Sequence, residues 1–187
     1  THTTNVKHVY ARERGQSFPE TDGMITDVPG ICLVTSYADC VPLYFVDPVK
    51  KVIGLSHSGW RGTVGKIGKV TVEKMEEEFG CDPADILGAV GPSICQDCYE
   101  VSEDVIKKFC ENYDENLWPE IFYQKENGKY QLNLWKANES VFLESGILPE
   151  HIAVTNVCTH CNPDILFSHR TTGNERGTLS AFLALKK

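Results

Sequence analysis

The sequence predicts a single α/β domain in which helices cover a mixed β-sheet. Three observations support this fold class. Apolar strands follow one another closely between residues 30 and 55, a helical period begins after Gly62, and strands and helices alternate farther along the chain. Some strands succeed one another as in hairpins, whereas helices separate other pairs, so we expect both antiparallel and parallel neighbours. The 187 residues suffice for one domain with a substantial core.

A long apolar stretch over residues 30–62 forms the centre of the predicted sheet. Its strands are expected over residues 31–36, 41–46 and 52–55, after a short strand over residues 22–27. Two polar segments interrupt these apolar runs: Asp39-Cys40, and the residues from Ser56 to Gly62. Side chains at such strand ends are held rigidly at the edge of a cleft, where sites are commonly built.

The remaining elements follow from periodicity and end signals. Apolar side chains recur every three to four residues from Val64 to Phe79, and Gly80 supplies a stop. This pattern predicts one helix of about four to five turns that starts after Gly62. Ser102 and Asn133 are expected to cap two further helices. Further strands are predicted over residues 85–90, 130–132, 152–157 and 178–185, with a hairpin turn at Asn127-Gly128.

Composition restricts the class of protein. The formal net charge of -8 and the pI of about 5.2 argue against a nucleic-acid partner, because such proteins present clustered Lys and Arg. No window approaches the roughly 18 consecutive apolar residues of a membrane span, so we expect no membrane partner. The eight cysteines are irregularly spaced, which favours reduced thiols and a cytoplasmic location over a disulfide framework.

Cys40 and His57 carry the first chemical signal. Seventeen residues separate them, about the length of two strands and a turn, so the two side chains can be neighbours at one end of the sheet. A thiolate and an imidazole there could bind zinc, or the histidine could activate a cysteine nucleophile. A small buried thiol beside an unrelated surface histidine fits the spacing as well.

Several motifs together carry a family resemblance. They are ADCVP at residues 38–42, HSGWRG at 57–62, GPSI at 91–94, CYEV at 98–101, CT and CNPD within 158–164, and FSHR at 167–170 followed by TG at 172–173. In this order they resemble the family known both as laccase-like multicopper polyphenol oxidases and as purine nucleoside phosphorylases. The resemblance implies a layered α/β/β/α sandwich. Members normally carry a further N-terminal region, so we expect a trimmed chain or a shorter relative.

The resemblance also implies a zinc site made of two histidines and one cysteine. Cys40 and His57 match the last two ligands, and His2 fits the spacing of the first, with His8 as the competing candidate. The family has a Gly after its first histidine, where this chain has Thr3. Three protein ligands and an open fourth position are typical of a catalytic zinc, which lowers the pKa of bound water toward about 7. Copper is the alternative metal.

Candidates for substrate binding lie near the same strand ends and farther along the chain. We expect Arg61 and Arg170 to hold phosphate oxygens and Trp60 to stack on a planar base. The first turn of the helix after Gly62 would add backbone N–H groups beside Arg61. Asp39 could orient a ligand or act as a base. The alternatives are a salt bridge for Arg170, a packing role for Trp60 and a strand-end cap for Asp39.

Four further cysteines form two C-x-x-C pairs, Cys95 with Cys98 and Cys158 with Cys161. The 60-residue gap from Cys98 to Cys158 argues against a zinc ribbon, because ribbon pairs are normally separated by roughly 15 to 20 residues. We expect these cysteines to have structural roles outside the metal site. His160, beside Cys161, leaves a second metal site open.

We therefore predict a zinc-dependent purine nucleoside phosphorylase, with catalytic residues Cys40, His57 and Asp39, that acts on adenosine, inosine or methylthioadenosine type nucleosides with phosphate. Adenosine deamination is left open as a further activity. The alternatives are a copper-dependent polyphenol oxidase, a metal-free cysteine hydrolase using Cys40 and His57, and a metal-stabilised binding module. Against the oxidase, the six histidines supply no His-x-His pair. We expect small-molecule partners only, and a monomer or weak homo-oligomer.

Overall fold

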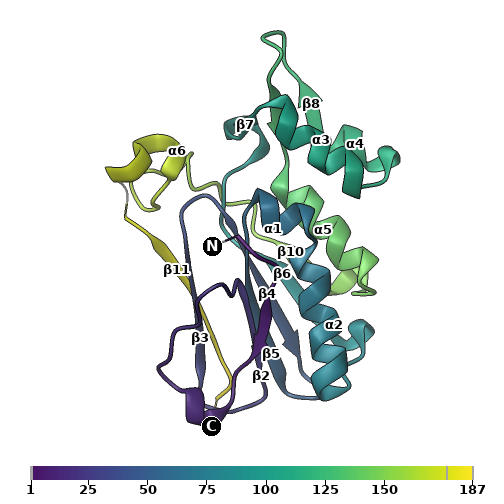
Figure 1. Cartoon of the computed structure of the whole chain (residues 1–187), viewed down its shortest axis with the longest axis vertical. Helices are drawn as coiled ribbons and strands as arrows, with labels where there is room; N and C mark the ends of the chain where they lie inside the picture. The colour runs from purple at the N-terminus through teal and green to yellow at the C-terminus, as the bar shows by residue number, and fades with distance from the viewer. Residues whose placement is uncertain (1, 176, 187) are drawn as a thin grey trace.

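The computed structural model describes residues 2–175 and 177–186. At its centre is a six-stranded sheet in the order β1-β2-β5-β4-β6-β10 (Figure 1). The strands are β1 (Val6–His8), β2 (Gly23–Thr26), β4 (Val41–Asp47), β5 (Val52–Ser58), β6 (Leu87–Val90) and β10 (Ile152–Val154). β1 is parallel to β2 and β6 to β10, while the other neighbours are antiparallel. The predicted mixed sheet is therefore confirmed.

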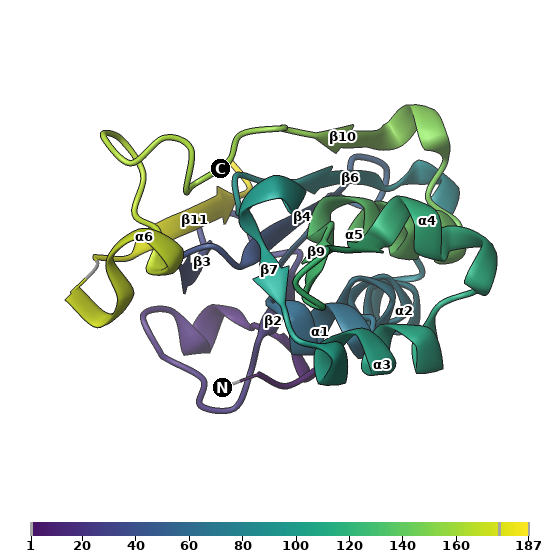
Figure 2. The ribbon, with the colours of Figure 1, turned by 90° about the horizontal axis from the view of Figure 1, so that it is seen from above.

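A second sheet covers one face of the main sheet. β3 (Cys32–Tyr37) pairs antiparallel with β11 (Leu179–Ala184), and the pair packs against β5 (Figures 1 and 2). Alternate residues of β3 are buried, as expected of a strand with one face in a core and one face outward. Leu33 and Leu55 belong to the apolar core between the two sheets.

Helices cover the opposite face. α2 (Ile67–Phe79) and α5 (Leu134–Glu144) contact each other and pack on the main sheet. Phe45 of β4 and Phe142 of α5 meet edge to face in this larger core, with their ring centroids 5.2 Å apart. β5 is buried along nearly its whole length because it lies between the two cores. This layering confirms the predicted α/β class.

A smaller unit extends from the helical side. It contains the three-stranded sheet β7-β9-β8, α3 and α4 (Figure 2). The bounds are β7 (Glu100–Val101), α3 (Glu103–Asn112), α4 (Trp118–Ile121), β8 (Phe122–Gln124) and β9 (Tyr130–Leu132). Asn127 and Gly128 form the predicted hairpin turn, and the Asn133 side chain caps α5 by accepting the Lys136 N–H. Ser102 stands at the N-cap of α3, but its hydroxyl donates to the Asp104 carboxylate instead.

The predicted helix after Gly62 is in fact two helices. α1 (Trp60–Val64) begins directly after β5, and α2 begins only at Ile67. Lys66 between them has a left-handed backbone with φ 53°, which interrupts the helical path. The prediction was wrong because apolar spacing alone does not reveal such a break. The end of α2 at Gly80, with φ 64°, is as predicted.

A buried polar network holds α1 against the end of β5. The hydroxyls of Ser58 and Thr63 lie 2.9 Å apart, and Ser58 also donates to the side-chain carbonyl of Asn138 on α5. The Asn138 amide in turn donates to Thr63 Oγ1. Buried groups that satisfy one another in this way fix a unique geometry. The segment that carries Trp60 and Arg61 is thus held at a defined angle.

The last α-helix of the fold is short. α6 (His169–Thr172) lies near the start of β11, with the Ser168 hydroxyl accepting the Thr171 N–H at its N-terminus. Among the described residues, no helix has the length and apolarity that crossing a membrane would require.

Candidate active site

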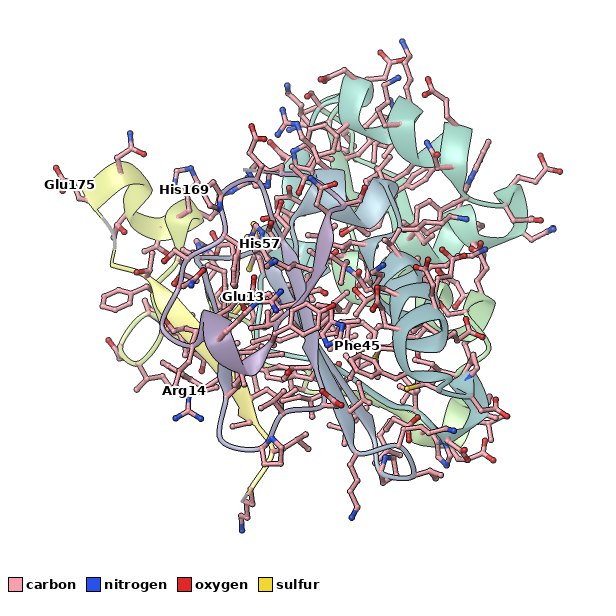
Figure 3. The ribbon with its side chains drawn as sticks, turned by 60° about the horizontal axis from the view of Figure 1, so that its bottom comes forward. Glu13, Arg14, Phe45, His57, His169 and Glu175 are labelled. Carbon is pink, nitrogen blue, oxygen red and sulfur yellow. The ribbon has the colours of Figure 1, made fainter. Side chains whose placement is uncertain are left out.

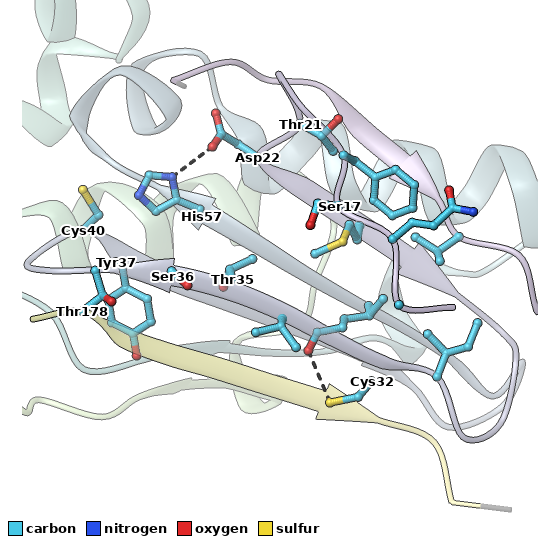
Figure 4. A pocket seen from close by; sticks show the side chains of 18 of the residues that line it. Ser17, Thr21, Asp22, Cys32, Thr35, Ser36, Tyr37, Cys40, His57 and Thr178 are labelled. Carbon is cyan, nitrogen blue, oxygen red and sulfur yellow. Dashed lines mark hydrogen bonds and ion pairs between the residues drawn. The ribbon is translucent and has the colours of Figure 1, made fainter. Parts of the chain in front are cut away.

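The adjoining ends of β4 and β5 bring Cys40 and His57 to one edge of the main sheet. Val41 lies opposite Ser58 and Pro42 opposite His57, and Cys40 directly precedes this first pair. Figure 4 shows the Cys40 sulfur and the His57 ring on the same side of the strands. The structure thus agrees with the predicted placement at strand ends, while the chemical roles of both residues stay predictions.

His2 approaches the same edge from the N-terminal segment. The centroids of the His2 and His57 rings are 5.6 Å apart. Gly59 lies against His2 and Cys40, since a Cβ built at Gly59 would be 3.1 Å from Cys40 Sγ and 3.3 Å from His2 Nδ1. A residue without a side chain therefore leaves the space in which the sulfur and the imidazole approach each other. We call His2, Cys40 and His57 the His-Cys-His cluster.

Asp22 is a residue of this region that sequence reasoning missed. It is 8% exposed, and its Oδ1 lies 3.2 Å from His57 Nδ1 (Figure 4). Its Oδ2 accepts the backbone N–H of Thr3. One carboxylate thus fixes both the His57 ring and the segment that carries His2, and it leaves His57 Nε2 for a ligand. The sequence signal was only an Asp-Gly pair before a short strand, which indicates a turn equally well.

His8, the competing candidate, lies elsewhere. Its Nδ1 is 3.1 Å from Glu78 Oε2 on α2, and its ring stacks on Tyr10. At His2, partial removal of the ring from water, followed by the nearby His57, lowers the pKa. The lowered pKa favours the neutral imidazole, which is the form that binds metal. Of the two histidines, His2 is the one that lies beside Cys40 and His57.

A cavity of ≈ 840 Å³ opens beside the His-Cys-His cluster. His2, Cys40 and His57 lie on its wall, and β3 and the loop that holds Ser17 and Thr21 form other parts of it (Figure 4). Glu13 and His169 add polar groups to the lining (Figure 3). Small-molecule sites typically enclose about 300–1,000 Å³, so this cavity has the size for such a ligand.

Asp39 is bound on both carboxylate oxygens. Its Oδ1 accepts the Thr159 hydroxyl at 2.6 Å, and its Oδ2 accepts the backbone N–H of Arg170 at 2.7 Å. Its backbone is left-handed with φ 77°, a conformation that Asp tolerates better than most residues. The side chain is buried. These contacts favour a positioning role for Asp39 beside Cys40 over that of a base.

Trp60, Arg61 and Arg170 gather near a second, smaller cavity. Trp60 and Arg170 line this cavity of ≈ 290 Å³, while the Arg61 guanidinium lies 4.3 Å from the Trp60 ring centroid. Within the described residues, Arg170 does not form the salt bridge that was the alternative to phosphate binding. Its guanidinium donates to the Glu100 carbonyl at 3.0 Å and lies 5.4 Å from the Tyr99 ring. The three candidates are therefore close together, but outside the lining of the larger cavity.

Tyr99 connects these groups to the His-Cys-His cluster. Burial, followed by the nearby Cys40, raises the pKa of Tyr99 to about 12, and the charge of Arg170 acts in the opposite direction. The charges of Asp39 and Arg61 also affect the pKa of Tyr99. This phenol is therefore close enough to interact with the groups beside Cys40 and with those beside Trp60. At neutral pH the hydroxyl keeps its proton and can donate a hydrogen bond. Tyr99 lies in the CYEV motif, but the sequence alone does not indicate a role for it.

Cys95, Cys98, Cys158 and Cys161 form a second group, which we call the cysteine cluster. Their Sγ atoms all lie within 4.8 Å of one another. The long gap in sequence therefore does not keep the two pairs apart, while the role of these cysteines stays a prediction. β6 and β10 are parallel neighbours, so the segments that follow them leave the sheet at the same edge despite the long gap in sequence. His160 is separate, with its Nδ1 2.9 Å from the Thr171 hydroxyl.

Comparison with known proteins shows the family. The model of the family described as "multi-copper polyphenol oxidoreductase laccase" matches residues 1–186. The chain belongs to this family. It is 34% identical over 197 residues to "Purine nucleoside phosphorylase YlmD" of Bacillus subtilis, covering 100% of this chain and 69% of the relative. It is also 34% identical over 184 residues to "Adenosine deaminase RL5" of an unknown prokaryotic organism, covering 95% and 70%.

A solved structure agrees with this assignment. YlmD from Geobacillus stearothermophilus superimposes on the protein with a TM-score of 0.93 at 34% identity, covering 100% of this chain and 71% of that one. The recognition of the family from the motifs is therefore confirmed. Relatives carry the names of two different activities, a phosphorylase and a deaminase, within a family whose own description refers to a laccase. The protein thus belongs to an enzyme family with purine nucleoside chemistry among its relatives.

Proposed function

We propose that the protein is a zinc-dependent purine nucleoside phosphorylase. It splits nucleosides of the adenosine, inosine or methylthioadenosine type with phosphate, releasing the base and a sugar 1-phosphate. The observation that carries this proposal is the convergence of His2, Cys40 and His57 on the wall of a cavity of ≈ 840 Å³. The names of the phosphorylase relatives support it.

The His-Cys-His cluster fits a zinc ion by the chemistry of its donors. Two imidazoles and one thiolate are a set that zinc accepts, and Gly59 leaves the space between Cys40 and His2 clear. The Asp22 carboxylate on His57 Nδ1 is the outer partner that metal-binding histidines usually have. When bound, zinc would supply a Lewis acid with one open position. A thiolate ligand suits a reducing compartment, so we place the enzyme in the cytoplasm.

Phosphate would be held by the arginines beside the cluster. Arg61 is exposed at the start of α1, and its guanidinium fork matches phosphate oxygens. Arg170 already contacts the Glu100 carbonyl and the Tyr99 ring, so we expect it to contribute less directly than Arg61 to phosphate binding. Trp60 presents a ring on which a purine can stack. Holding an anion and a nucleoside in a fixed relation is mainly a positioning and electrostatic task.

The first experiment follows base release by chromatography. Protein purified without added metal is incubated with adenosine, inosine or methylthioadenosine, with and without phosphate. We expect base and sugar 1-phosphate to appear only when phosphate is present, and about one zinc per chain to be associated with the activity. Base release that is independent of phosphate would show a hydrolase. Oxidation of phenols with added copper, without base release, would show the oxidase.

The second experiment tests the phosphate site. Arg61→Ala should raise the KM for phosphate roughly tenfold or more and change the KM for nucleoside less, since a hydrogen bond to a charged group contributes about 1.5–3 kcal/mol. Arg61→Lys should restore part of the loss, because it keeps the charge without the fork. Arg12→Ala is the matched control. Arg12 lies over the Tyr10 ring at 5.0 Å, much as Arg61 lies over the Trp60 ring, but Tyr10 lines neither cavity, whereas Trp60 lines the smaller one.

Adenosine deamination is the second candidate, favoured by the relative that carries this name. It would give inosine from adenosine without phosphate and should be less sensitive to Arg61→Ala. The copper-dependent polyphenol oxidase finds less support in the geometry. His8 pairs with Glu78 and His160 with Thr171, so these histidines do not add to the pair formed by His2 and His57. We propose that the protein is a monomer or a weak homo-oligomer.

A further inference from the structure

The cysteine cluster lies outside the proposed active site and is built from two loops. After β6, Cys95 precedes a short 3-10 turn (Gln96–Cys98) that ends at Cys98. Cys158 and Cys161 belong to the turn after β10. A parallel bridge between Ser93 and Cys158 holds the two loops side by side. Each loop contains two cysteines, and the parallel pairing of β6 with β10 places the two loops next to each other.

The spacing of the four sulfur atoms suits one tetrahedral metal ion. All four lie within 4.8 Å of one another, and Cys98 Sγ is 3.4 Å from Cys161 Sγ. Four Zn–S bonds of about 2.3 Å give a tetrahedron whose edges are about 3.8 Å. In the described part of the chain, no other group of three or more His, Cys, Asp or Glu, the His-Cys-His cluster included, has its ligand atoms gathered closely enough to hold a metal ion as they stand. Small adjustments of the side chains would complete the coordination.

At Cys158 the surroundings favour an anionic sulfur. Cys158 Sγ accepts two backbone N–H groups, from Cys95 at 3.3 Å and from Cys161 at 3.4 Å. Hydrogen bonds of this kind stabilise the thiolate over the thiol. Cys161 is exposed, and only Cys158 of the four is fully buried, so filling an apolar core does not account for the arrangement.

We propose that Cys95, Cys98, Cys158 and Cys161 bind one zinc ion in a closed structural site. Four thiolate ligands fill the coordination sphere and leave no position for substrate, in contrast to the three ligands of the His-Cys-His cluster. Binding releases the thiol protons to solvent as each sulfur becomes a ligand, so affinity falls as the pH falls. Tetrahedral sulfur sites take zinc or iron, and the proposal is for zinc.

The ion would join the segment between β10 and α6 to the edge of the active site. Between β10 and α6 the chain has no regular strand or helix, and Ile165 and Phe167 are 76% and 51% exposed. In the same segment, Thr159 donates to the Asp39 carboxylate, and Asp39 directly precedes Cys40. A metal that fixes Cys158 and Cys161 therefore also fixes the hydroxyl that positions Asp39.

The test uses the full chain carrying Cys40→Ala, so that zinc at the His-Cys-His cluster does not contribute. Elemental analysis of this protein, purified under reducing conditions, should find about one zinc per chain. Adding Cys161→Ser should lower the zinc content at least tenfold. Cys110→Ser is the matched control, because Cys110 is a half-buried cysteine on α3 outside both clusters, and it should leave the zinc content unchanged.

A second measurement keeps the proposal testable if the Cys161 variant fails to fold. Titration of the Cys40→Ala protein with a thiol-binding mercurial should release zinc in step with the modification of four thiols. Cobalt substituted for zinc should give the intense visible bands of a tetrahedral thiolate site. Absence of metal from the Cys40→Ala protein, iron in its place, or disulfides between the two loops found by mass spectrometry after anaerobic purification would each overturn the proposal.

Discussion

The His-Cys-His cluster and the cysteine cluster place cysteine side chains in opposite settings. Cys40 and His57 stand at the ends of paired strands and face a cavity of ≈ 840 Å³, and the cluster has three members. The four cysteines stand on two loops, and their sulfur atoms face one another. Three ligands beside a cavity suit a reaction, whereas four ligands around a closed centre suit a structural link. The number of ligands and the space in front of them distinguish the two.

The two clusters meet at Asp39. This residue precedes Cys40 in the chain, and its carboxylate is held by Thr159, which follows Cys158. Its backbone carbonyl also accepts the Ile94 N–H from the segment before Cys95. Both loops of the cysteine cluster therefore contact the residue beside Cys40. Changes to one cluster should therefore reach the other through Asp39 and through Tyr99, which follows Cys98 and whose pKa is raised by burial and by the nearby Cys40.

Cys40→Ala should have the largest effect on activity. Loss of a metal ligand removes several kcal/mol of transition-state stabilisation, and about 4 kcal/mol corresponds to roughly a thousandfold in kcat/KM. The unfolding temperature should change little, because the side chain is small and lies beside the cavity. Cys110→Ala serves as the control. Steady-state kinetics measure the loss of activity, and calorimetry measures the unfolding temperature. Activity close to wild type in Cys40→Ala would mean that the His-Cys-His cluster is not the reaction centre.

Asp22→Asn should weaken the metal site by a smaller factor. The carboxylate orients His57, and loss of such an outer partner typically costs about 10–100-fold in metal affinity or activity. Glu78→Gln is the matched control, since Glu78 forms the same kind of carboxylate–imidazole pair with His8 away from the cavity. Zinc affinity is measured by competition with a chelator. Equal affinities in the two variants would leave Asp22 with a purely structural role.

Gly59→Ala should act by steric exclusion. The new methyl group would lie 3.1 Å from Cys40 Sγ, and overpacking of this kind costs about 1–3 kcal/mol. We expect roughly a tenfold loss of zinc affinity, since about 1.4 kcal/mol is a factor of ten. The backbone at Gly59 has φ -72°, so alanine itself is tolerated there. Gly62→Ala, whose methyl group would first meet the His57 carbonyl at 3.4 Å, should bind zinc as wild type does.

The sequence predicted the parts of the site that depend on neighbouring strands. The distance along the chain from Cys40 to His57 is two strands and a turn, so their proximity followed from counting residues. Asp22 reaches His57 only because β2 pairs with β5, with Gly23 opposite Ser56. No local pattern specifies that pairing. The approach of His2 depends on the same strand and on the contact of Asp22 with Thr3, and its spacing in a motif was the only guide.

Local sequence patterns did not predict the cysteine cluster or the break between α1 and α2. Strand pairing of β6 with β10 crosses more than sixty residues, and a rule based on the local spacing of ribbons does not anticipate it. The helix break rests on a left-handed Lys66, a residue with no special preference for that conformation. The close approach of the Thr4 methyl group, 2.6 Å from a Cβ built at Gly65, adds a tertiary reason for the break at this point. Local sequence patterns predicted the helices and strands, whereas long-range contacts determined where a helix breaks and which strands pair.

Thr159→Val tests the link between the clusters and should have the smallest effect. Valine keeps the shape of threonine but removes the hydroxyl that donates to Asp39 at 2.6 Å. A buried carboxylate oxygen that loses its partner costs about 1–3 kcal/mol, so the unfolding temperature should fall by a few degrees. Because Thr159 is not a ligand in either cluster, zinc content should be unchanged. Activity should fall only severalfold, since Arg170 still donates to the other oxygen.

The control for this variant is Thr155→Val, the same chemical change at an exposed position four residues earlier. It should leave stability and kcat near wild type. If Thr159→Val lowers kcat while the control does not, the cysteine loop positions the active site through Asp39. If Thr159→Val lowers stability alone, with kcat unchanged, the two clusters are independent and the loop only supports the fold. Loss of zinc in Thr159→Val would contradict both readings, because it would make the hydroxyl part of the metal site itself.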